Sequence, residues 1–482
     1  MATIAQTIPR RTLLNTAAIF GGEAFARLAT FLMALIVARR FGAEALGQYG
    51  YALALASVLL LVPDFGLHLL TTRDLAAHPR ELSRLFWSLH WLKLPLAAGV
   101  IVFTLVFGHW VVEDEGRRLL LYILVGRALL QTFSLAYMAI FKAFEQMQHI
   151  ALVQFVNAGL VVASALLALE LKLSAPVVIS AFLVGQAAES VLAWRIIHRR
   201  FPPERIPPID GRLLAGMFFA AVPIGLTAVL HALNLRLDLL ILSIYVPNQE
   251  LGRFQAAQWF VIGSFLGTSL LMSVIFPKLS RVLDAPAERA TAYITSLLKH
   301  GLLAATLLSL AVWVGAPWWL HGFFGSGLAA SADLLRMLAP VLPLVSLNTL
   351  LFFVFVAARR RGAYLGTLTV GVAAGTVLGL LLAPRYGAAG SVIAALVREF
   401  VMTATFLYLL ARENLAPAAG KVLLKMLLVV TMVSVMGASM TARLVLAVEW
   451  PAAWSVLVLA GTLLFAGMPR RRELLLLADE ES

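Results

Sequence analysis

Four arginines lie in the middle of long apolar stretches, at Arg27, Arg127, Arg236 and Arg398. A charge at the centre of a bilayer costs about 2.5–3.5 kcal/mol on insertion scales, so such residues usually face a protein interior or a water-filled path. Because a guanidinium donates two parallel hydrogen bonds to a phosphate edge and keeps its charge, it suits the binding of a phosphate. We therefore predict that the four arginines line a cavity that receives an anion.

Acidic side chains accompany these arginines. Glu23 lies four residues before Arg27, which places both on one helix face. The other acidic candidates are Asp238, two residues after Arg236; Glu399, beside Arg398; and Glu189, alone in its apolar stretch. Each is a candidate for taking up a coupling ion or for neutralising an arginine. The alternatives are structural pairs between helices, a packed protonated carboxyl at Glu189 and, for Arg236 and Asp238, snorkelling. Lys93 lies nearer the end of its stretch and is also predicted to snorkel.

Other chemistry is absent from the sequence. There are no cysteines, the nine histidines show no metal-ligand spacing, and no Gly-rich nucleotide loop is present. We therefore expect no cofactor, no metal, no ATP hydrolysis and no enzyme activity. The glycines of residues 371–379 (GVAAGTVLG) recur every four residues, which is typical of helix packing. The net charge of +13 suggests membrane topology and not nucleic acid, because the basic residues fall in short loops.

The elements that must position these residues are membrane helices. Of the 482 residues, 61% are hydrophobic and 13% are charged, against about 45–50% and 25% in soluble domains. Since a span needs about 20 apolar residues, the sequence predicts an all-α polytopic membrane protein with about fourteen helices. The predicted spans are 13–38, 46–63, 85–108, 118–140, 150–169, 176–197, 213–245, 253–276, 293–319, 334–357, 363–383, 388–410, 422–447 and 452–468.

Loop charge predicts the orientation of these spans. With the N-terminus inside, inner loops hold about 24 basic residues and outer loops about nine. The acidic run 113–115 then falls outside, whereas Arg39 and Arg40 break the pattern. Fourteen spans also return the C-terminus to the cytoplasm. We therefore predict that both termini are cytoplasmic.

The longest polar interruption, residues 198–212, contains four prolines and separates two groups of six spans. The predicted domains are a six-helix bundle over 1–197, a cytoplasmic linker over 198–212, a second bundle over 213–411, and two extra helices with a tail over 412–482. LGQYGYA at 46–52 resembles LGRFQAA at 251–257, at an offset of 205 residues. This similarity favours parallel repeats related by an axis along the membrane normal. The alternative for 198–212 is an ordinary long loop.

Three segments resemble the polysaccharide flippase family, a branch of the multidrug, oligosaccharidyl-lipid and polysaccharide exporter superfamily. They are residues 38–76 (ARRFGAEALGQYGYA…TTRDLA), 251–281 (LGRFQAAQWF…FPKLSR) and 383–400 (APRYGAAGSVIAALVREF). The resemblance implies two six-helix bundles in a V, with a central cavity that opens alternately to each side. It also implies a substrate, an oligosaccharide on undecaprenyl diphosphate, moved to the outer leaflet of a bacterial cytoplasmic membrane.

On this resemblance, Arg27, Arg127, Arg236 and Arg398 would hold the diphosphate while the prenyl chain stays among membrane lipids. Since no ATP site is present, H⁺ or Na⁺ is the expected coupling ion. Whether a polysaccharide polymerase and chain-length proteins are partners is left open, as are the sugar composition and the oligomeric state. The competing functions are a multidrug exporter of the same superfamily, a peptidoglycan-precursor flippase and a membrane enzyme. An enzyme would need a large outer loop with catalytic side chains, and the outer loops here are short.

Overall fold

The computed structural model describes residues 10–203, 208–413 and 415, without the side chains of residues 10–20 and 23. Within these residues the chain is helical, with short turns and no strand. Its contacts group it into two compact units, which divide between Arg236 and Leu237. The all-helical prediction is confirmed. The predicted domain boundaries stay predictions, and the last two predicted spans lie outside the described residues.

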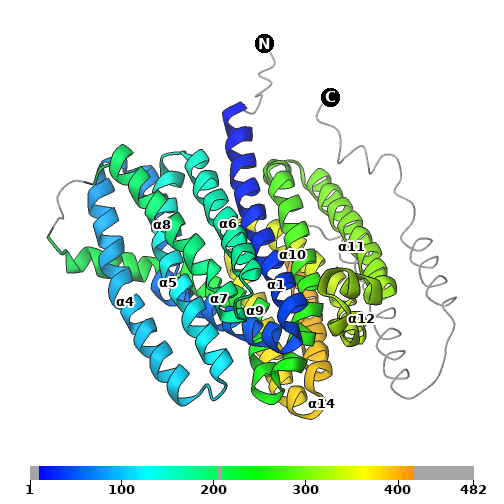
Figure 1. The fold of residues 1–482 in the computed structure, drawn as a ribbon. Helices are drawn as coiled ribbons and strands as arrows, with labels where there is room; N and C mark the ends of the chain where they lie inside the picture. Colours follow the sequence, from blue (N-terminus) through cyan, green and yellow to red (C-terminus); the bar gives the residue numbers. More distant parts are fainter. Residues whose placement is uncertain (1–9, 204–207, 414, 416–482) are drawn as a thin grey trace. The chain divides into compact units, whose positions relative to one another are not determined.

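The first unit contains the helices up to Arg236, in the last third of α9 (Figure 1). They are α1 (Arg10–Leu59), α2 (Leu61–Asp64), α3 (Leu67–Ala77), α4 (Leu82–Trp110), α5 (Glu115–Ala143), α6 (Met147–Glu170), α7 (Ala175–Ile179), α8 (Ala181–Arg200) and α9 (Gly211–Tyr245), with the short turn η1 (Pro79–Glu81). Within this unit α1 packs along α5 and α6, and α8 packs against the same two helices. Three of these helices carry half of the candidate residues: α1 carries Glu23 and Arg27, α5 carries Arg127, and α8 carries Glu189.

The second unit begins in the last part of α9. It continues with α10 (Asn248–Leu283), α11 (Ala287–Phe324), η2 (Ser326–Ser331), α12 (Ala332–Leu338), α13 (Val341–Ala357) and α14 (Arg361–Arg412). Helix α13 is its centre, because it packs against α10, α11 and α14. Asn348 is one of its buried polar residues.

Nine helices of the described chain are long and apolar enough to span a membrane, or ten if η2 to α13, bent by 53°, counts as one. Two of these, 54 and 52 residues long, would each be about 80 Å as straight helices, more than twice the thickness of a hydrocarbon core. The first is broken at Gly42 (φ 84°) and again at Phe65 and Gly66, and the second is broken at Gly387 (φ 54°). Dividing the first at Gly42 and the second at Gly387 raises the ten candidate spans to twelve. Twelve is the number predicted for this part of the chain. The multi-pass membrane architecture is thereby confirmed.

The two broken helices share a local sequence. Arg-Phe-Gly-Ala precedes the second part of α1 and Arg-Tyr-Gly-Ala precedes the second part of α14, with the glycine at the break each time. Gly42 has a ψ of −173° with its φ of 84°, a backbone region that is essentially restricted to glycine. The glycine therefore turns the chain between two spans without a separate loop.

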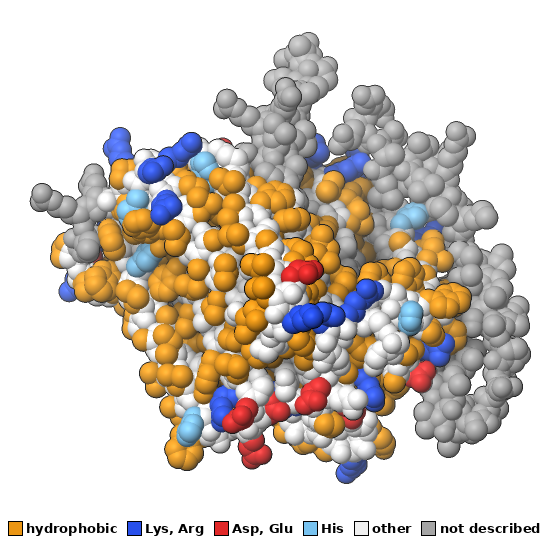
Figure 2. Space-filling model, in the orientation of Figure 1, with side chains coloured by type: hydrophobic (Ala, Val, Ile, Leu, Met, Phe, Trp, Pro, Cys, Tyr) orange, Lys and Arg blue, Asp and Glu red, His pale blue; other side chains and the backbone are white. Residues whose placement is uncertain are grey.

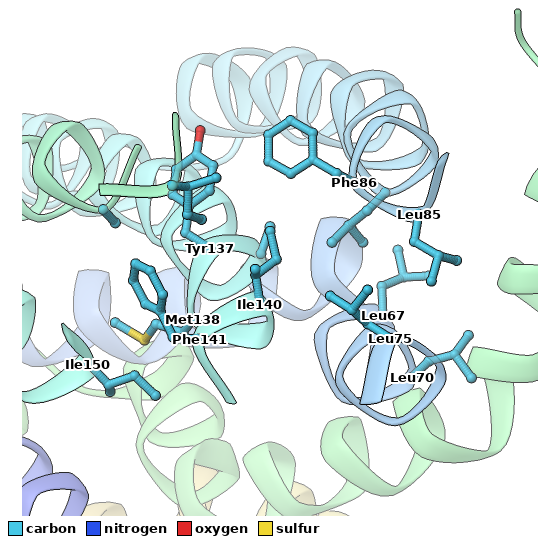
Figure 3. Close-up of a cluster of buried hydrophobic side chains, with 14 of the residues drawn as sticks. Leu67, Leu70, Leu75, Leu85, Phe86, Tyr137, Met138, Ile140, Phe141 and Ile150 are labelled. Atoms are coloured by element: carbon cyan, nitrogen blue, oxygen red, sulfur yellow. The ribbon is translucent and has the colours of Figure 1, made fainter. Parts of the chain in front are cut away.

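The core of the first unit is a buried apolar cluster between α3, α4, α5 and the ends of α6, α8 and α9. Figure 3 shows Leu67, Leu70 and Leu75 of α3 opposite Ile140 and Phe141 of α5. The outward faces are apolar too: on α4, Val102 is 62% exposed and Trp110 is 78% exposed. Figure 2 shows this broad hydrophobic surface. Such an outer surface is expected for helices that face lipid.

Two aspartates tie loops to helix starts in the first unit. Asp114 caps α5, accepting from the backbone N–H of Arg117 at 2.6 Å and from Gln48 of α1 at 3.2 Å. Asp210 caps α9 by accepting from the N–H of Leu213 at 3.1 Å, and it pairs with Arg84 of α4 at 3.0 Å. The N–H of Leu213 and the Arg84 guanidinium hold the pKa of Asp210 below its usual value. The end of the proline-rich connector is thereby attached to α4.

Candidate functional site

Arg127 lies in the middle of α5, about 18 Å from its first residue. Its guanidinium carbon lies 4.8 Å from the centre of the Phe182 ring of α8. The Phe182 ring also stacks on Tyr49 of α1, whose ring is parallel to it with centroids 6.3 Å apart. A cation over a ring face is attracted by the electrons of the ring, so this stack orients Arg127 without neutralising its charge.

Tyr49 is fully buried, and its hydroxyl has no hydrogen-bond partner among the described residues. It comes from the LGQYGYA segment, where Leu46 and Ala52 are buried as well. At the offset of 205 residues, Phe254 is equally buried in α10. The tyrosine thus has a hydroxyl where the corresponding residue of the other half, Phe254, has none. A buried hydroxyl without a protein partner is costly unless water or another group binds it.

Glu189 of α8 lies in a hydrogen-bonded network and is 4% exposed. Its carboxylate accepts from the Asn157 amide of α6 and, at 3.0 Å, from the Gln186 amide. Gln186 also donates to the Ser134 hydroxyl of α5 at 3.0 Å, and Ser134 contacts the Ser190 hydroxyl at 2.7 Å. Glu189 is close enough to Arg127 for an electrostatic interaction, with no ion pair between them. The network thus places one partly neutralising charge near the arginine.

Arg236 lies in α9, nine residues before its end. It interacts electrostatically with Tyr49 and with Arg127, so two like charges face the same tyrosine. Its Nη1 is buried and has no hydrogen-bond partner among the described residues. Two neighbouring guanidiniums with an unfilled donor form a local positive potential. This is the arrangement that an anion would stabilise.

Arg27 lies on α1, 15 residues before the break at Gly42. Its side chain is exposed, and it interacts electrostatically with His231 of α9. Arg27 belongs to the same unit as Arg127 and Arg236. The side chain of Glu23 lies outside the described part of the structure, so its pairing with Arg27 stays a prediction.

Arg398 has different surroundings, in the second unit. It is 4% exposed and donates to Asp238 of α9 at 2.6 Å and to Glu399 at 3.2 Å. Asn348 of α13 donates to the Glu399 carboxylate at 2.9 Å, and Thr403 donates to Asn348 at 2.8 Å. The guanidinium is thus bonded to two carboxylates. Its predicted binding of substrate requires these bonds to be exchanged for bonds to the ligand.

Glycines on the first part of α14 make room for Arg398. A Cβ on Gly375 would lie 2.8 Å from Cδ of Arg398, and a Cβ on Gly371 would lie 2.3 Å from Met402. Gly379 lies against Ile241 of α9 in the same manner. The interpretation of residues 371–379 as a helix-packing pattern is confirmed.

The prediction that Lys93 snorkels is wrong. Its side chain is fully buried in α4, with Nζ 2.6 Å from Asp64 of α2 and 2.7 Å from the Thr132 carbonyl of α5. An ammonium buried in this way needs its carboxylate partner, and Asp64 supplies it. Asp64 was not among the predicted residues, although an aspartate within the apolar run LVPDFG was the available signal.

Of the predicted residues, the first unit brings together Arg127, Arg236 and Glu189, and the second brings together Arg398, Asp238 and Glu399. Tyr49, Phe182 and Asp64 were not predicted. Among the residues that the structure describes, no group of three His, Asp or Glu side chains is arranged to hold a metal ion.

Comparisons with known proteins give a family and a fold. The sequence model of the family described as polysaccharide biosynthesis protein matches residues 12–283, more than half of the chain. No protein of curated function matches the sequence. A structure of the lipid II flippase MurJ in an inward closed conformation has a TM-score of 0.69 and 12% identity, covering 94% of this chain and 97% of that one.

Two further structures have the same fold. An inward-facing multidrug resistance MATE family transporter of the MOP superfamily has a TM-score of 0.58 and 14% identity, covering 82% of this chain and 96% of that one. A MOP superfamily transporter from Pyrococcus furiosus, described as having a binding pocket of reverse polarity, has a TM-score of 0.56 and 14% identity, covering 85% and 96%. At these identities the similarity concerns the fold alone.

Proposed function

Because the chain belongs to the polysaccharide biosynthesis protein family, we propose that it is a flippase for undecaprenyl-diphosphate-linked oligosaccharide. It would move an O-antigen or exopolysaccharide repeat unit from the inner to the outer leaflet of a bacterial cytoplasmic membrane by alternating access. The family supports a role in polysaccharide synthesis. The shared fold of the lipid II flippase MurJ supports the transport of a lipid by this architecture.

The observation that carries the proposal is the pair Arg127 and Arg236 beside Tyr49. Arg127 interacts with one nearby carboxylate, Glu189, which hydrogen bonds already hold in place, and Arg236 adds a second positive charge beside Arg127. The unfilled Nη1 of Arg236 and the unfilled Tyr49 hydroxyl are both donors to an anion. A diphosphate offers many acceptor oxygens and is the charged part of a lipid-linked sugar. A cationic drug would meet repulsion at this site.

Arg27 and Arg398 are proposed to act at other moments of the cycle. Arg27 is exposed in the first unit and would meet the diphosphate early. Arg398 would contribute only after Asp238 or Glu399 releases it. Protonation of either carboxylate would weaken that hold, which links substrate binding to H⁺. Glu23 and Glu189 are the corresponding candidates in the first unit, and Na⁺ is the alternative coupling ion.

The test is transport in proteoliposomes. A fluorescent undecaprenyl-diphosphate oligosaccharide is incorporated, and its arrival in the opposite leaflet is followed with a membrane-impermeant quencher. We expect Arg127→Ala and Arg27→Ala to slow transport roughly 10- to 100-fold. This factor corresponds to the loss of one charge-assisted hydrogen bond, which contributes about 1.5–3 kcal/mol. Arg127→Lys should restore part of the rate, because it keeps the charge but loses the two-pronged geometry.

The control is Arg118→Ala. Arg118 lies at the start of the same helix, α5, and pairs with the exposed Glu115 at 3.4 Å, so its loss should leave transport unchanged. Unaltered transport in both Arg127→Ala and Arg27→Ala would overturn the binding site. Faster movement of lipid II or of an organic cation than of the oligosaccharide lipid would instead support one of the competing functions.

A further inference from the structure

The second span of the chain is broken in the middle of the first unit. Helix α2 ends at Asp64, α3 begins at Leu67, and the two residues between them, Phe65 (φ 32°) and Gly66 (φ 77°), are left-handed. A Cβ on Gly66 would lie 2.9 Å from the backbone nitrogen of Gly225 in α9, so backbone meets backbone at this point. No group of the proposed diphosphate site lies in the break.

Three ionisable side chains converge on the break. One oxygen of the buried Asp64 carboxylate lies 2.6 Å from Lys93 Nζ of α4, and the other lies 2.5 Å from Nδ1 of His68 in α3. The bond from His68 to Asp64 therefore joins α2 to α3 across the break. Lys93 also donates to the Thr132 carbonyl of α5, which joins the break to two further helices.

The groups that face this cluster are few. On α4, His90 lies one turn before Lys93; its Nδ1 is 2.7 Å from the Phe86 carbonyl and its buried Nε2 has no partner among the described residues. Around His90 lie the Tyr137 ring of α5, at 5.7 Å, and His198 of α8. Helix α9 meets the break with Ile224 and Gly225, and α1 leads into α2 through the uncharged residues 52–60.

The three side chains differ in their exposure to solvent. The side chains of Lys93 and Asp64 are 0% and 4% exposed, whereas that of His68 is 20% exposed. An ionised carboxylate only accepts, so Nδ1 of His68 carries the hydrogen and Nε2 is left to take up a proton. Histidine is the side chain whose charge changes between about pH 5 and 8. When His68 is neutral, the cluster has no net charge. When His68 is protonated, the Asp64 carboxylate is paired with two cations, Lys93 and His68.

We propose that His68, Asp64 and Lys93 form a proton-binding site that changes the angle of the break between α2 and α3. The proton comes from water, forms one N–H bond at Nε2 and adds one positive charge. Asp64 is then drawn from Lys93 towards the imidazolium across the break. Taken with the proposed function, on which this last step rests, the site lets a proton gradient drive the transport cycle.

The absence of cysteine from the chain makes the test direct. Spin labels at Ala77→Cys, the end of α3, and Gln148→Cys, in the first turn of α6, report the position of α3 within the first unit. In the full-length protein we expect the distance distribution to differ between about pH 5.5 and pH 8, the range in which histidine titrates. His68→Gln, which does not titrate, should abolish the difference.

Two further variants test whether the response to pH comes from the charge of His68. His68→Arg carries a permanent charge and should show the low-pH distribution at both pH values, whether or not the Gln variant folds. His109→Gln, at the exposed end of α4, should behave as the parent protein does. A pH-dependent shift that persists in His68→Gln, or a distribution in His68→Arg that still changes with pH, would overturn the proposal.

A transport measurement separates this proposal from the proposed function. A pH gradient should accelerate lipid movement several-fold in the parent protein and have no effect in His68→Gln, while exchange without a gradient continues in both. Equal acceleration in His68→Gln would overturn the proton site alone. If no oligosaccharide lipid moves in the parent protein but the spin-label response to pH remains, the proposed function fails and the proton site stands.

Discussion

Arg127 and Arg398 are both mid-span arginines, yet their surroundings differ in the number of carboxylates bonded to them. Arg398 has two, and Arg127 has none within ion-pair distance among the described residues. A buried charge that loses its partner is strongly destabilising, whereas one poised over an aromatic ring remains available to a ligand. The same residue type thus holds helices together in the second unit and, on the proposed function, binds an anion in the first.

Arg398→Gln is expected to lower the free energy of unfolding by about 3–5 kcal/mol, because Asp238 and Glu399 would be left buried without their cation. The double variant Arg398→Gln with Asp238→Asn should recover part of this loss. Unfolding of the purified protein in detergent, followed by circular dichroism, measures both. Arg336→Gln is the control, because its pair with Asp333 is exposed and contributes at most about 1 kcal/mol. Equal stability of Arg398→Gln and Arg336→Gln would refute the structural role.

Sequence alone identifies a mid-span arginine but not the atoms bonded to it. Asp238 lies 160 residues from Arg398 and Asp64 lies 29 residues from Lys93, so neither pair follows from helix periodicity. Neighbours one turn apart, such as Gln186 and Glu189, are within reach of such reasoning. This is why the arginines could be predicted while the state of Arg398, and the burial of Lys93, could not.

At the scale of elements, hydropathy locates the spans, because lipid requires long apolar helices. It does not reveal how consecutive spans are joined. Residues 38–46 and 383–388 read as short interruptions, and in the structure the two helices on either side meet at a single glycine of positive φ. That geometry depends on φ and ψ, on which hydropathy carries no information.

Gly42→Ala is expected to destabilise the protein by about 1–3 kcal/mol, because its φ of 84° and ψ of −173° suit glycine alone. A Cβ at Gly42 would meet nothing within 4 Å, so the cost is one of backbone and not of packing. The melting temperature in detergent measures the effect.

Gly159→Ala is the matched control for this experiment. Gly159 is also free of neighbours within 4 Å but lies inside α6, where alanine favours the helix by roughly 0.5–1 kcal/mol. A melting temperature for Gly42→Ala that equals or exceeds that of Gly159→Ala would contradict the importance of the break.

At the scale of the whole molecule, the uneven distribution of basic loops predicts which ends of the helices face the cytoplasm. Glu113→Cys, between α4 and α5, should react with a membrane-impermeant maleimide on intact spheroplasts. Gln148→Cys, in the first turn of α6, should react only after permeabilisation. Labelling of the two positions in the opposite order would reverse the predicted orientation and, with it, the predicted direction of transport.

The paired positive charges beside Tyr49 have a consequence for the energetics of the cell. A wide passage for a bulky lipid head group could also let ions leak and dissipate the ion gradients across the membrane. Fixed guanidiniums repel K⁺, Na⁺ and hydronium alike, as rings of arginine do in anion-selective pores. On the proposed function, an opening beside Arg127 and Arg236 would thus admit an anionic head group while it excludes these cations.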